Sequence, residues 1–257
     1  MVDAVLIDID GVLTVSWEPL AGAVEALGRL EVPFALVTNT TSRTREWIAT
    51  TLADAGFPVG IDDVYTAPTV TAAYLAEHHP GARCALLNSG DIGADLAEVD
   101  LVPIEKSTVD VVVVGGAGPE FSYDALNAAF GHVQRGASLV AMARNLCWRT
   151  TEGLQLDGGA FLSGLEAAAG VEATVVGKPA TEFFATALAT LSAGPGGAVM
   201  IGDDLAADVL AAQRAGLTGV LVRTGKFRQE TLDASNERPD HVVDSFADLP
   251  GLLRELG

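Results

Sequence analysis

The sequence predicts an α/β fold built on a parallel β-sheet, with a second, smaller α/β block inserted into the chain. Two observations support this prediction. Short β-branched apolar segments alternate with longer helix-like segments. Several of the apolar segments are also continuous, as in Val111–Val114 and Ala198–Ile201. Strands that are buried on both faces of a parallel sheet have this pattern. At 257 residues, the chain has room for one large domain or two modest ones.

The predicted core consists of residues 1–79 and 173–257, which lie on either side of the inserted block. Its expected strands are Ala4–Asp8, Phe34–Thr38, Ala173–Val176, Ala198–Gly202 and Gly219–Val222. Its expected helices are Ala21–Leu30, Arg43–Ala55, Thr69–His78, Thr181–Leu191 and Leu205–Ala215. Alternation of strands and helices of this kind is typical of βα units that share one parallel sheet.

Residues 80–172 form the predicted inserted domain. We expect strands near Cys84–Leu87, Val109–Gly115 and Leu139–Met142, and helices at Tyr123–Gln134 and Phe161–Ala169. Because this block has enough strands for a sheet of its own, we interpret it as a separate α/β domain. It is also a candidate surface for a homodimer.

The composition excludes several classes of partner. The formal net charge is −19, and the only lysines are Lys106, Lys178 and Lys226. Such a surface repels nucleic acids and anionic lipids, and no apolar segment approaches the ~20 residues that span a bilayer. Cys84 and Cys147 are far apart, and no basic segment precedes the first apolar stretch, so we expect a cytoplasmic protein. A small anionic substrate would need local positive charge from a metal ion or a lysine.

Polar residues follow four of the expected strands or open the helices behind them. In open α/β sheets, ligands bind at the carboxyl ends of the strands. The polar residues at these positions are Asp8 and Asp10, Thr38 and Asn39, Lys178, and Asp203 with Asp204 and Asp208. Singly, each group has a simpler interpretation: Asp-x-Asp-Gly is compatible with a turn or part of a calcium loop, and paired aspartates can cap a helix. Their combination in four separate loops indicates a catalytic site.

These residue types suit phosphoryl transfer. A carboxylate can attack phosphorus and so divide one difficult step into two. A second carboxyl group can protonate the leaving oxygen and then deprotonate the attacking water. Clustered carboxylates bind Mg²⁺, which prefers oxygen ligands and neutralises phosphate oxygens. A lysine, a threonine hydroxyl and backbone N–H groups can hold the phosphoryl group.

The four segments "DIDGVLT", "VTNTT", "VVGKP" and "MIGDDLAADV" resemble the four motifs of the haloacid dehalogenase (HAD) superfamily. The long insert between the second and third motifs is similar to that of subclass IIA, whose members carry an α/β cap domain of the C2 type. Within it, "VVGKPATEFFATAL", "AVMIGDDLAADVLAAQRAGLTG" and "VRTGKFR" resemble the branch that contains the phospholysine phosphohistidine inorganic pyrophosphate phosphatases. The resemblance implies a Rossmann-like core with a cap and a magnesium-dependent phosphatase of small phosphorylated metabolites, possible substrates including pyrophosphate and phosphoramidates.

The resemblance also implies a role for each motif residue. Asp8 would be the nucleophile, forming an aspartyl-phosphate, and Asp10 would be the general acid and base. Thr38, Asn39 and Lys178 would hold the phosphoryl group, with Lys178 bridging it and the nucleophile.

The implied metal ligands for Mg²⁺ are Asp8, the backbone carbonyl of Asp10, and Asp203. Asp204 and Asp208 would lie behind these ligands, with Asp208 orienting Lys178.

Substrate choice is expected to depend on the inserted domain, because the core residues recognise only a phosphoryl group. The candidate segment is Ala143–Gly153, which carries Arg144, Asn145, Trp148 and Arg149. Arginines there could clamp an anionic or carbonyl-bearing leaving group, and Trp148 could offer a stacking face. The alternative is that Trp148 packs inside the domain and the arginines are solvated.

Two other functions stay open at this point. One is a catalytically idle protein whose acidic surface and cap serve protein interaction. The other is a 2-haloacid dehalogenase. Asp10 and Asp203 suit phosphate chemistry better than dehalogenation, and an idle protein has no need of so many clustered charges.

Overall fold

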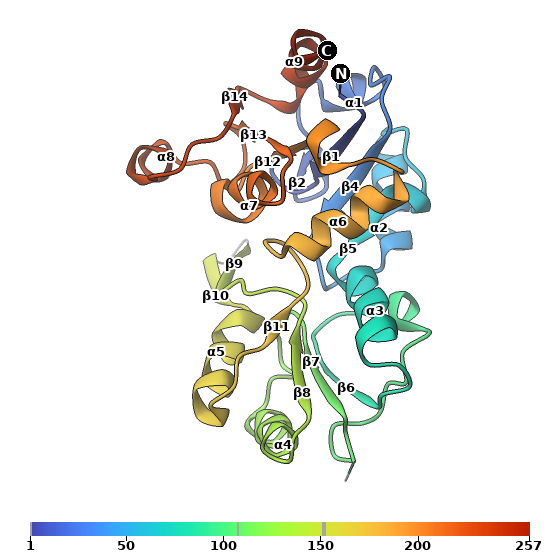
Figure 1. Cartoon of the computed structure of the whole chain (residues 1–257), viewed down its shortest axis with the longest axis vertical. Coiled ribbons are helices and arrows are strands. Elements are labelled where there is room, and N and C mark those ends of the chain that lie inside the picture. Colours follow the sequence, from blue (N-terminus) through green and yellow to red (C-terminus); the bar gives the residue numbers. More distant parts are fainter. Residues whose placement is uncertain (1, 107, 151–152) are drawn as a thin grey trace. The chain divides into compact units, whose positions relative to one another are not determined.

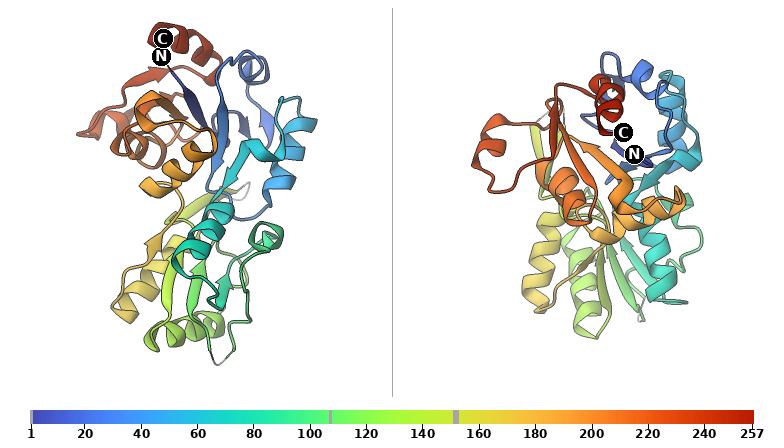
Figure 2. Two further views of the ribbon diagram at one scale, coloured as in Figure 1. Left: turned by 45° about the vertical axis from the view of Figure 1, so that its right-hand side comes forward. Right: turned by 45° about the horizontal axis from the view of Figure 1, so that its top comes forward.

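The computed structural model describes residues 2–106, 108–150 and 153–257, and the chain divides into two compact units. Unit 1 comprises Met1–Thr38, Arg45–Tyr65 and Lys178–Gly257. Unit 2 comprises Asn39–Thr44 and Thr66–Gly177. Figures 1 and 2 show the two termini side by side in unit 1. No helix within the described residues has both the length and the apolar character needed to cross a membrane.

Unit 1 contains a six-stranded sheet with the strand order β14-β13-β12-β1-β4-β5 (Figure 1). The strands are β1 (Ala4–Asp8), β4 (Phe34–Thr38), β5 (Val64–Thr66), β12 (Ala198–Gly202), β13 (Thr218–Val222) and β14 (His241–Val243). β1 pairs in parallel with β12 on one side and with β4 on the other, and β12, β13 and β14 continue the parallel arrangement. The predicted bounds of β1, β4 and β12 are confirmed.

The core of unit 1 forms where helices cover this sheet. Val5 and Ile7 alternate along β1 onto the same face, which is the expected period of two in a strand. They pack with buried residues of α1 (Ala23–Leu27) and α2 (Arg45–Asp54) and with Leu249 of α9 (Leu249–Leu256). A further helix, α6 (Thr181–Thr190), also packs against β1. All five residues of β1 are buried, so its last side chain is held in place by the strand.

Two short elements follow the ends of β1 and β12. A hairpin of β2 (Thr14–Val15) and β3 (Glu18–Pro19) follows β1. A π-helix, Leu205–Leu210, follows β12 and continues as α7 (Ala211–Arg214), where the sequence predicted a single α-helix. The difference arises from the first turn, in which the Val209 amide also reaches the carbonyl of Asp204. The helix α8 (Gln229–Ala234) lies further along the chain.

Unit 2 has its own sheet, with the order β11-β8-β7-β6 and parallel pairing throughout. Its strands are β6 (Cys84–Leu87), β7 (Val111–Val114), β8 (Ser138–Ala141) and β11 (Thr174–Val175), and its helices are α3 (Ala67–His78), α4 (Tyr123–Gln134) and α5 (Gly158–Ala169). Residues of β7, β8, α4 and α5 form one hydrophobic core. The hairpin of β9 (Cys147–Thr150) and β10 (Gly153–Leu156) begins within the candidate segment Ala143–Gly153.

The units divide at residues other than those the sequence predicted. The expected core strand Ala173–Val176 is instead β11, which pairs with β8 in the sheet of unit 2. The helix α3 belongs to unit 2 as well, where it contacts the 3₁₀-helix Gly93–Leu96. A short segment, Asn39–Thr44, also lies in unit 2, because the side-chain amide of Asn88 donates to the carbonyl of Thr41 at 3.0 Å.

The start of α5 shows how local polar groups decide a helix boundary. The helix begins at Gly158, three residues before the predicted start, because the Asp157 side chain accepts a hydrogen bond from the Gly158 amide at 2.7 Å. A Cβ atom at Gly158 would lie 1.9 Å from the carbonyl oxygen of Gly115, so this position requires glycine. The sequence pattern indicates only the apolar part of the helix, so it predicts a later start.

Candidate active site

The carboxyl ends of three neighbouring strands place polar side chains at one edge of the unit 1 sheet. Asp8 is the last residue of β1, Thr38 is the last residue of β4, and Asp203 directly follows β12. All three are buried. Because β4, β1 and β12 are adjacent and parallel, their ends meet at the same edge, as ligand sites in open α/β sheets require.

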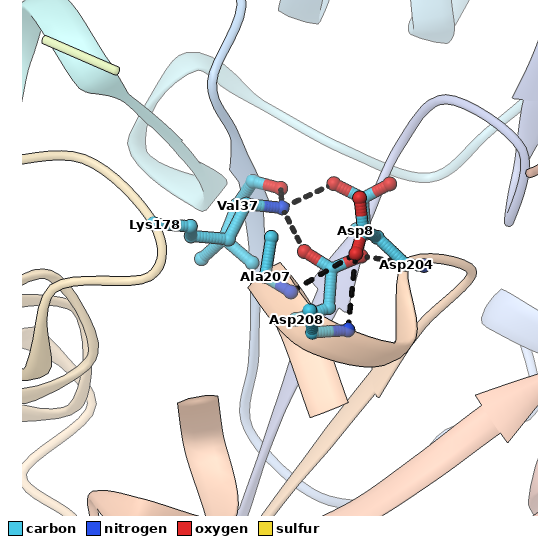
Figure 3. Close-up of polar contacts among 7 residues, drawn as sticks. Asp8, Val37, Lys178, Asp204, Ala207 and Asp208 are labelled. Carbon is cyan, nitrogen blue, oxygen red and sulfur yellow. Dashed lines mark hydrogen bonds and ion pairs between the residues drawn. The ribbon is translucent and has the colours of Figure 1, made fainter. Parts of the chain in front are cut away.

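Lys178 holds two of the carboxylates together (Figure 3). Its ammonium group donates to Oδ1 of Asp8 and forms an ion pair with Oδ1 of Asp208 at 2.8 Å. It also donates to the backbone carbonyl of Val37 at 3.3 Å. Lys178 is buried, with 4% of its side chain exposed, so these contacts form in a medium of low dielectric where they are strong. Lys178 therefore contacts Asp8 and Asp208, the two residues beside which the sequence analysis expected it.

The π-helix after β12 positions Asp204 and Asp208. One carboxylate oxygen of Asp204 accepts hydrogen bonds from the amides of Ala206 and Ala207, at 3.1 and 3.0 Å (Figure 3). The backbone amide of Asp204 in turn donates a hydrogen bond to Oδ2 of Asp208 at 3.2 Å. Asp204 is therefore a helix cap, and both oxygens of Asp208 are engaged by protein donors.

Asp203 has one satisfied and one unsatisfied oxygen. Oδ2 accepts a hydrogen bond of 2.7 Å from the backbone amide of Lys226. Oδ1 is buried and has no hydrogen-bond partner among the described residues. Leaving a buried charged oxygen without a partner costs free energy, so this atom is the kind of group that a cation would satisfy. Asp8, Asp203 and Asp208 offer carboxylate oxygens that lie within 4.8 Å of one another.

The electrostatics of the cluster follow from burial and like charge. Burial raises the pKa of Asp8 to about 7, with Lys178 opposing and Asp208 reinforcing the shift. Burial likewise raises the pKa of Asp203 to about 6, against the lowering effect of Lys226. Burial lowers the pKa of Lys178, but the charges of Asp208 and Asp8 outweigh it and leave that pKa above its usual value. The carboxylates thus repel one another without an added cation, whereas the lysine stays charged.

Two further predicted site residues, Asp10 and Asn39, closely follow the ends of β1 and β4 in the chain. The side chain of Asp10 is exposed and lies at the base of the β2–β3 hairpin, where Asp10 forms a bridge with Thr14. Asn39 follows Thr38 directly in the chain but belongs to unit 2, where a Cβ atom at Gly177 would lie 2.8 Å from its side-chain oxygen.

The segment expected to select substrates lies in unit 2. Arg144 is not an unpaired cation, because it forms a two-pronged ion pair with Glu166, at 2.9 and 2.6 Å. Asn145 is exposed, and its carbonyl accepts from the Gly159 amide at 3.0 Å. Trp148 and Arg149 are on β9, and residues 151 and 152 lie outside the described part of the chain. A structural role for Arg144 is therefore established beside the predicted role in selectivity.

Replacing Arg144 by alanine is expected to lower the free energy of unfolding by about 1–3 kcal/mol. The change leaves Glu166, whose side chain is 14% exposed, with the Ala173 amide as its remaining side-chain partner among the described residues. Thermal unfolding of the purified variant measures this loss. Arg223→Ala is the matched control, since it breaks a single-contact pair with Asp244 that is 51% and 80% exposed and should cost below about 1 kcal/mol. Equal losses in both variants would contradict the structural role of Arg144.

Lys226 is the main site residue that the sequence motifs did not single out. It supplies the amide that binds Asp203, and its charge lowers the pKa of both Asp203 and Asp8. One signal was available. The chain has only three lysines, and two of them, Lys178 and Lys226, lie at this site. In a chain with 34 acidic residues, the presence of two of the three lysines at one site indicates a site for an anion.

Comparison with known proteins agrees with this geometry. A family model for haloacid dehalogenase-like hydrolases matches residues 5–102, and a HAD-hydrolase-like model matches residues 175–249. Haloacid dehalogenase-like hydrolase domain-containing protein 2 of Bos taurus is 37% identical over 246 residues, covering 95% of this chain and 92% of the relative. The human phospholysine phosphohistidine inorganic pyrophosphate phosphatase is 35% identical over 261 residues, covering 98% of this chain and 94% of the relative.

A solved structure extends the comparison to the fold. A glycerol phosphate phosphatase from Mycobacterium tuberculosis, in complex with magnesium, superimposes with a TM-score of 0.87 at 29% identity. The match covers 96% of this chain and 76% of that one.

Proposed function

We propose that this chain is a Mg²⁺-dependent enzyme that hydrolyses small phosphorylated metabolites through an aspartyl-phosphate on Asp8. The chain belongs to the haloacid dehalogenase-like hydrolases and is a phosphatase. The observation that carries the proposal is the arrangement around Lys178. One buried ammonium group contacts Asp8 and Asp208, and the buried carboxylate of Asp203 beside them has an oxygen without a partner among the described residues.

The reaction divides into two displacements. In the first, a carboxylate oxygen of Asp8 attacks phosphorus while the bond from phosphorus to the leaving oxygen breaks, and Asp10 donates a proton to that oxygen. In the second, Asp10 takes a proton from water, which attacks the phosphorus of the aspartyl-phosphate and releases inorganic phosphate and free Asp8. The exposed side chain of Asp10 suits exchange of protons with water and with the leaving group.

Lys178 and the residues at the end of β4 hold the transferred group. The ammonium of Lys178 already lies against Asp8, so it can neutralise charge that develops on the phosphoryl oxygens. Asp208 keeps that ammonium in place through its 2.8 Å ion pair. The hydroxyl of Thr38 and the amide of Asn39 are the further donors that we assign to the phosphoryl group.

The site residues fit a divalent cation. Asp203 is the better ligand of the two buried aspartates after β12, because its Oδ1 has no partner in the described chain while both oxygens of Asp208 are bound. We assign the ion to Asp8, Asp203 and the backbone carbonyl of Asp10, a hard-oxygen set of the kind that Mg²⁺ prefers. When bound, Mg²⁺ would offset the repulsion of the carboxylates and the charge of the phosphoryl oxygens.

The proposed substrates are small phosphomonoesters. The acidic surface disfavours polyanionic partners, so a substrate with a single compact phosphate fits the charge balance. Pyrophosphate and phosphoramidates form the second class to be tested, because they are named for a relative that is 35% identical to this chain.

Hydrolysis of p-nitrophenyl phosphate tests the metal dependence. We expect the purified protein to release p-nitrophenol with Mg²⁺ and to lose more than about 100-fold of its rate in excess chelator, because the ion supplies several kcal/mol of charge stabilisation. The rate should return when Mg²⁺ is restored. Undiminished hydrolysis in chelator would contradict the proposal, and chloride release from 2-chloropropionate without phosphatase activity would favour the dehalogenase alternative.

A further inference from the structure

A turn after β13 packs directly against the catalytic edge. This turn, Thr224–Lys226, is called the clamp turn here. The hydroxyl of Thr224 donates to the backbone carbonyl of Gly11, and the amide of Lys226 donates to Oδ2 of Asp203. The clamp turn therefore contacts two separate loops: the one that follows β1 and the one that follows β12.

The fit around Asp203 is close enough to require glycine at two positions. Gly11 and Gly225 both have left-handed backbones, with φ of +87° and +58°. A Cβ atom at either glycine would lie 2.0 Å from Oδ2 of Asp203. A Cβ atom at Gly225 would also lie 2.6 Å from the Cα atom of Gly11. The Asp203 carboxylate is thus held between two backbone segments that no larger residue could form without displacing it.

This packing fixes one oxygen of Asp203 and leaves the other available. Oδ2 is bound by the Lys226 amide, whereas the buried Oδ1 has no partner among the described residues. The hydrogen bond from Lys226 and the close packing of Gly11 and Gly225 restrain rotation of this carboxylate. Groups that hold a ligand in this way affect metal affinity without touching the metal.

We propose that the clamp turn is a positioning element that orients Asp203 for Mg²⁺, so that Thr224 and Gly225 help to determine the affinity of the site for the ion. The inference rests on the proposed metal dependence. The hydrogen bond from Thr224 also restrains Gly11, the residue next to Asp10. The backbone carbonyl of Asp10 is one of the metal ligands assigned above. The clamp turn therefore restrains two of the three assigned ligands from outside the four sequence motifs.

Thr224→Val tests the hydroxyl, because valine keeps the shape of threonine and removes the donor. We expect the Mg²⁺ concentration for half-maximal binding to rise about 10- to 100-fold. Binding is measured on the full chain without substrate, as the increase in unfolding temperature during a titration with MgCl₂. Thr224→Ser should restore most of the affinity because it restores the hydroxyl. In assays with p-nitrophenyl phosphate, the Mg²⁺ requirement should change much more than kcat at saturating Mg²⁺.

Gly225→Ala tests the packing, and Gly216→Ala is its matched control. Both glycines have a left-handed φ, but the nearest atom to a Cβ at Gly216 is Cβ of Pro195 at 3.4 Å, away from the site. Both variants should lose stability without Mg²⁺, whereas Gly225→Ala alone should weaken Mg²⁺ binding.

The outcomes separate this inference from the proposed function. Parent-like Mg²⁺ affinity in both Thr224→Val and Gly225→Ala would overturn the positioning role while the metal dependence stands. Equal weakening in Thr224→Val and Thr224→Ser would overturn the role of the hydroxyl. A parent chain that shows no Mg²⁺-dependent stabilisation in the same titration would overturn the metal dependence and the positioning role together.

Discussion

Replacing Asp8 by asparagine is expected to lower the kcat/KM for p-nitrophenyl phosphate by at least about 10⁴-fold, as removal of a nucleophile that acts as part of a catalytic unit commonly does. An amide cannot attack phosphorus to form the covalent intermediate. The fold should persist, because burial and neighbouring aspartates already disfavour the charged form of Asp8 and Lys178 retains its ion pair with Asp208. Kinetics and thermal unfolding of the same preparation measure both expectations.

Asp10→Asn is the matched comparison, since it makes the same chemical change two residues away. With a good leaving group such as p-nitrophenolate, the first displacement needs little help from an acid, so this variant should still form some phosphoenzyme and hydrolyse it slowly. Intact-protein mass spectrometry after rapid acid quenching detects the covalent species. Near-normal turnover in Asp8→Asn, or phosphoenzyme formed by Asp8→Asn, would exclude Asp8 as the nucleophile.

Replacing Lys178 by methionine should reduce both activity and stability. The loss of one preorganised positive group is expected to lower kcat about 10²- to 10³-fold, or roughly 2.7–4 kcal/mol. The change also leaves Asp8 and Asp208 buried without their counter-ion, and breaking a buried pair from one side costs about 3–5 kcal/mol. Lys106→Met removes the same charge from an exposed residue of unit 2 and should leave both quantities near the parent values.

A second substitution separates the two effects. Lys178→Met combined with Asp208→Asn removes one of the uncompensated carboxylates, so we expect the double variant to regain part of the lost stability. It should regain none of the activity, because the ammonium beside Asp8 is still missing. The measurements are unfolding in the absence of Mg²⁺ and steady-state kinetics in its presence. If the double variant were no more stable than Lys178→Met, the stability loss would not come from repulsion between the buried aspartates.

The grouping of polar residues at one edge of the unit 1 sheet was largely predictable because strand ends are marked in the sequence. β1, β4 and β12 are continuous apolar segments that stop at a polar residue or a glycine, and their bounds agree with the prediction. Since parallel strands end at one edge, the sequence alone was sufficient to place Asp8, Thr38 and Asp203 together. The contacts of Lys178 with Asp8 and Asp208 are then consistent with the geometry of that edge.

Other features depend on contacts that no local pattern records. Lys226 binds Asp203 through its backbone amide, so its residue type carries no signal for that bond. β11 is only two residues long, and its sequence is equally compatible with either sheet; the pairing with β8 decides the matter. The π-helix differs from an α-helix by its hydrogen-bond register, whereas its apolar pattern predicts only a helix. In each case tertiary structure decides between local alternatives.

The path of the chain between the two units has a consequence for how such proteins can be recombined. The chain leaves unit 1 directly after Thr38 and returns for the last time at Lys178, so two residues of the catalytic edge are also splice points. A graft that exchanged residues 80–172 alone would leave α3 and β11 of the old domain in place. A complete exchange must instead carry residues 39–44 and 66–177, two pieces separated by a stretch of core. Any transplant with a junction immediately after Thr38 or immediately before Lys178 therefore edits the chain next to two residues of the proposed active site.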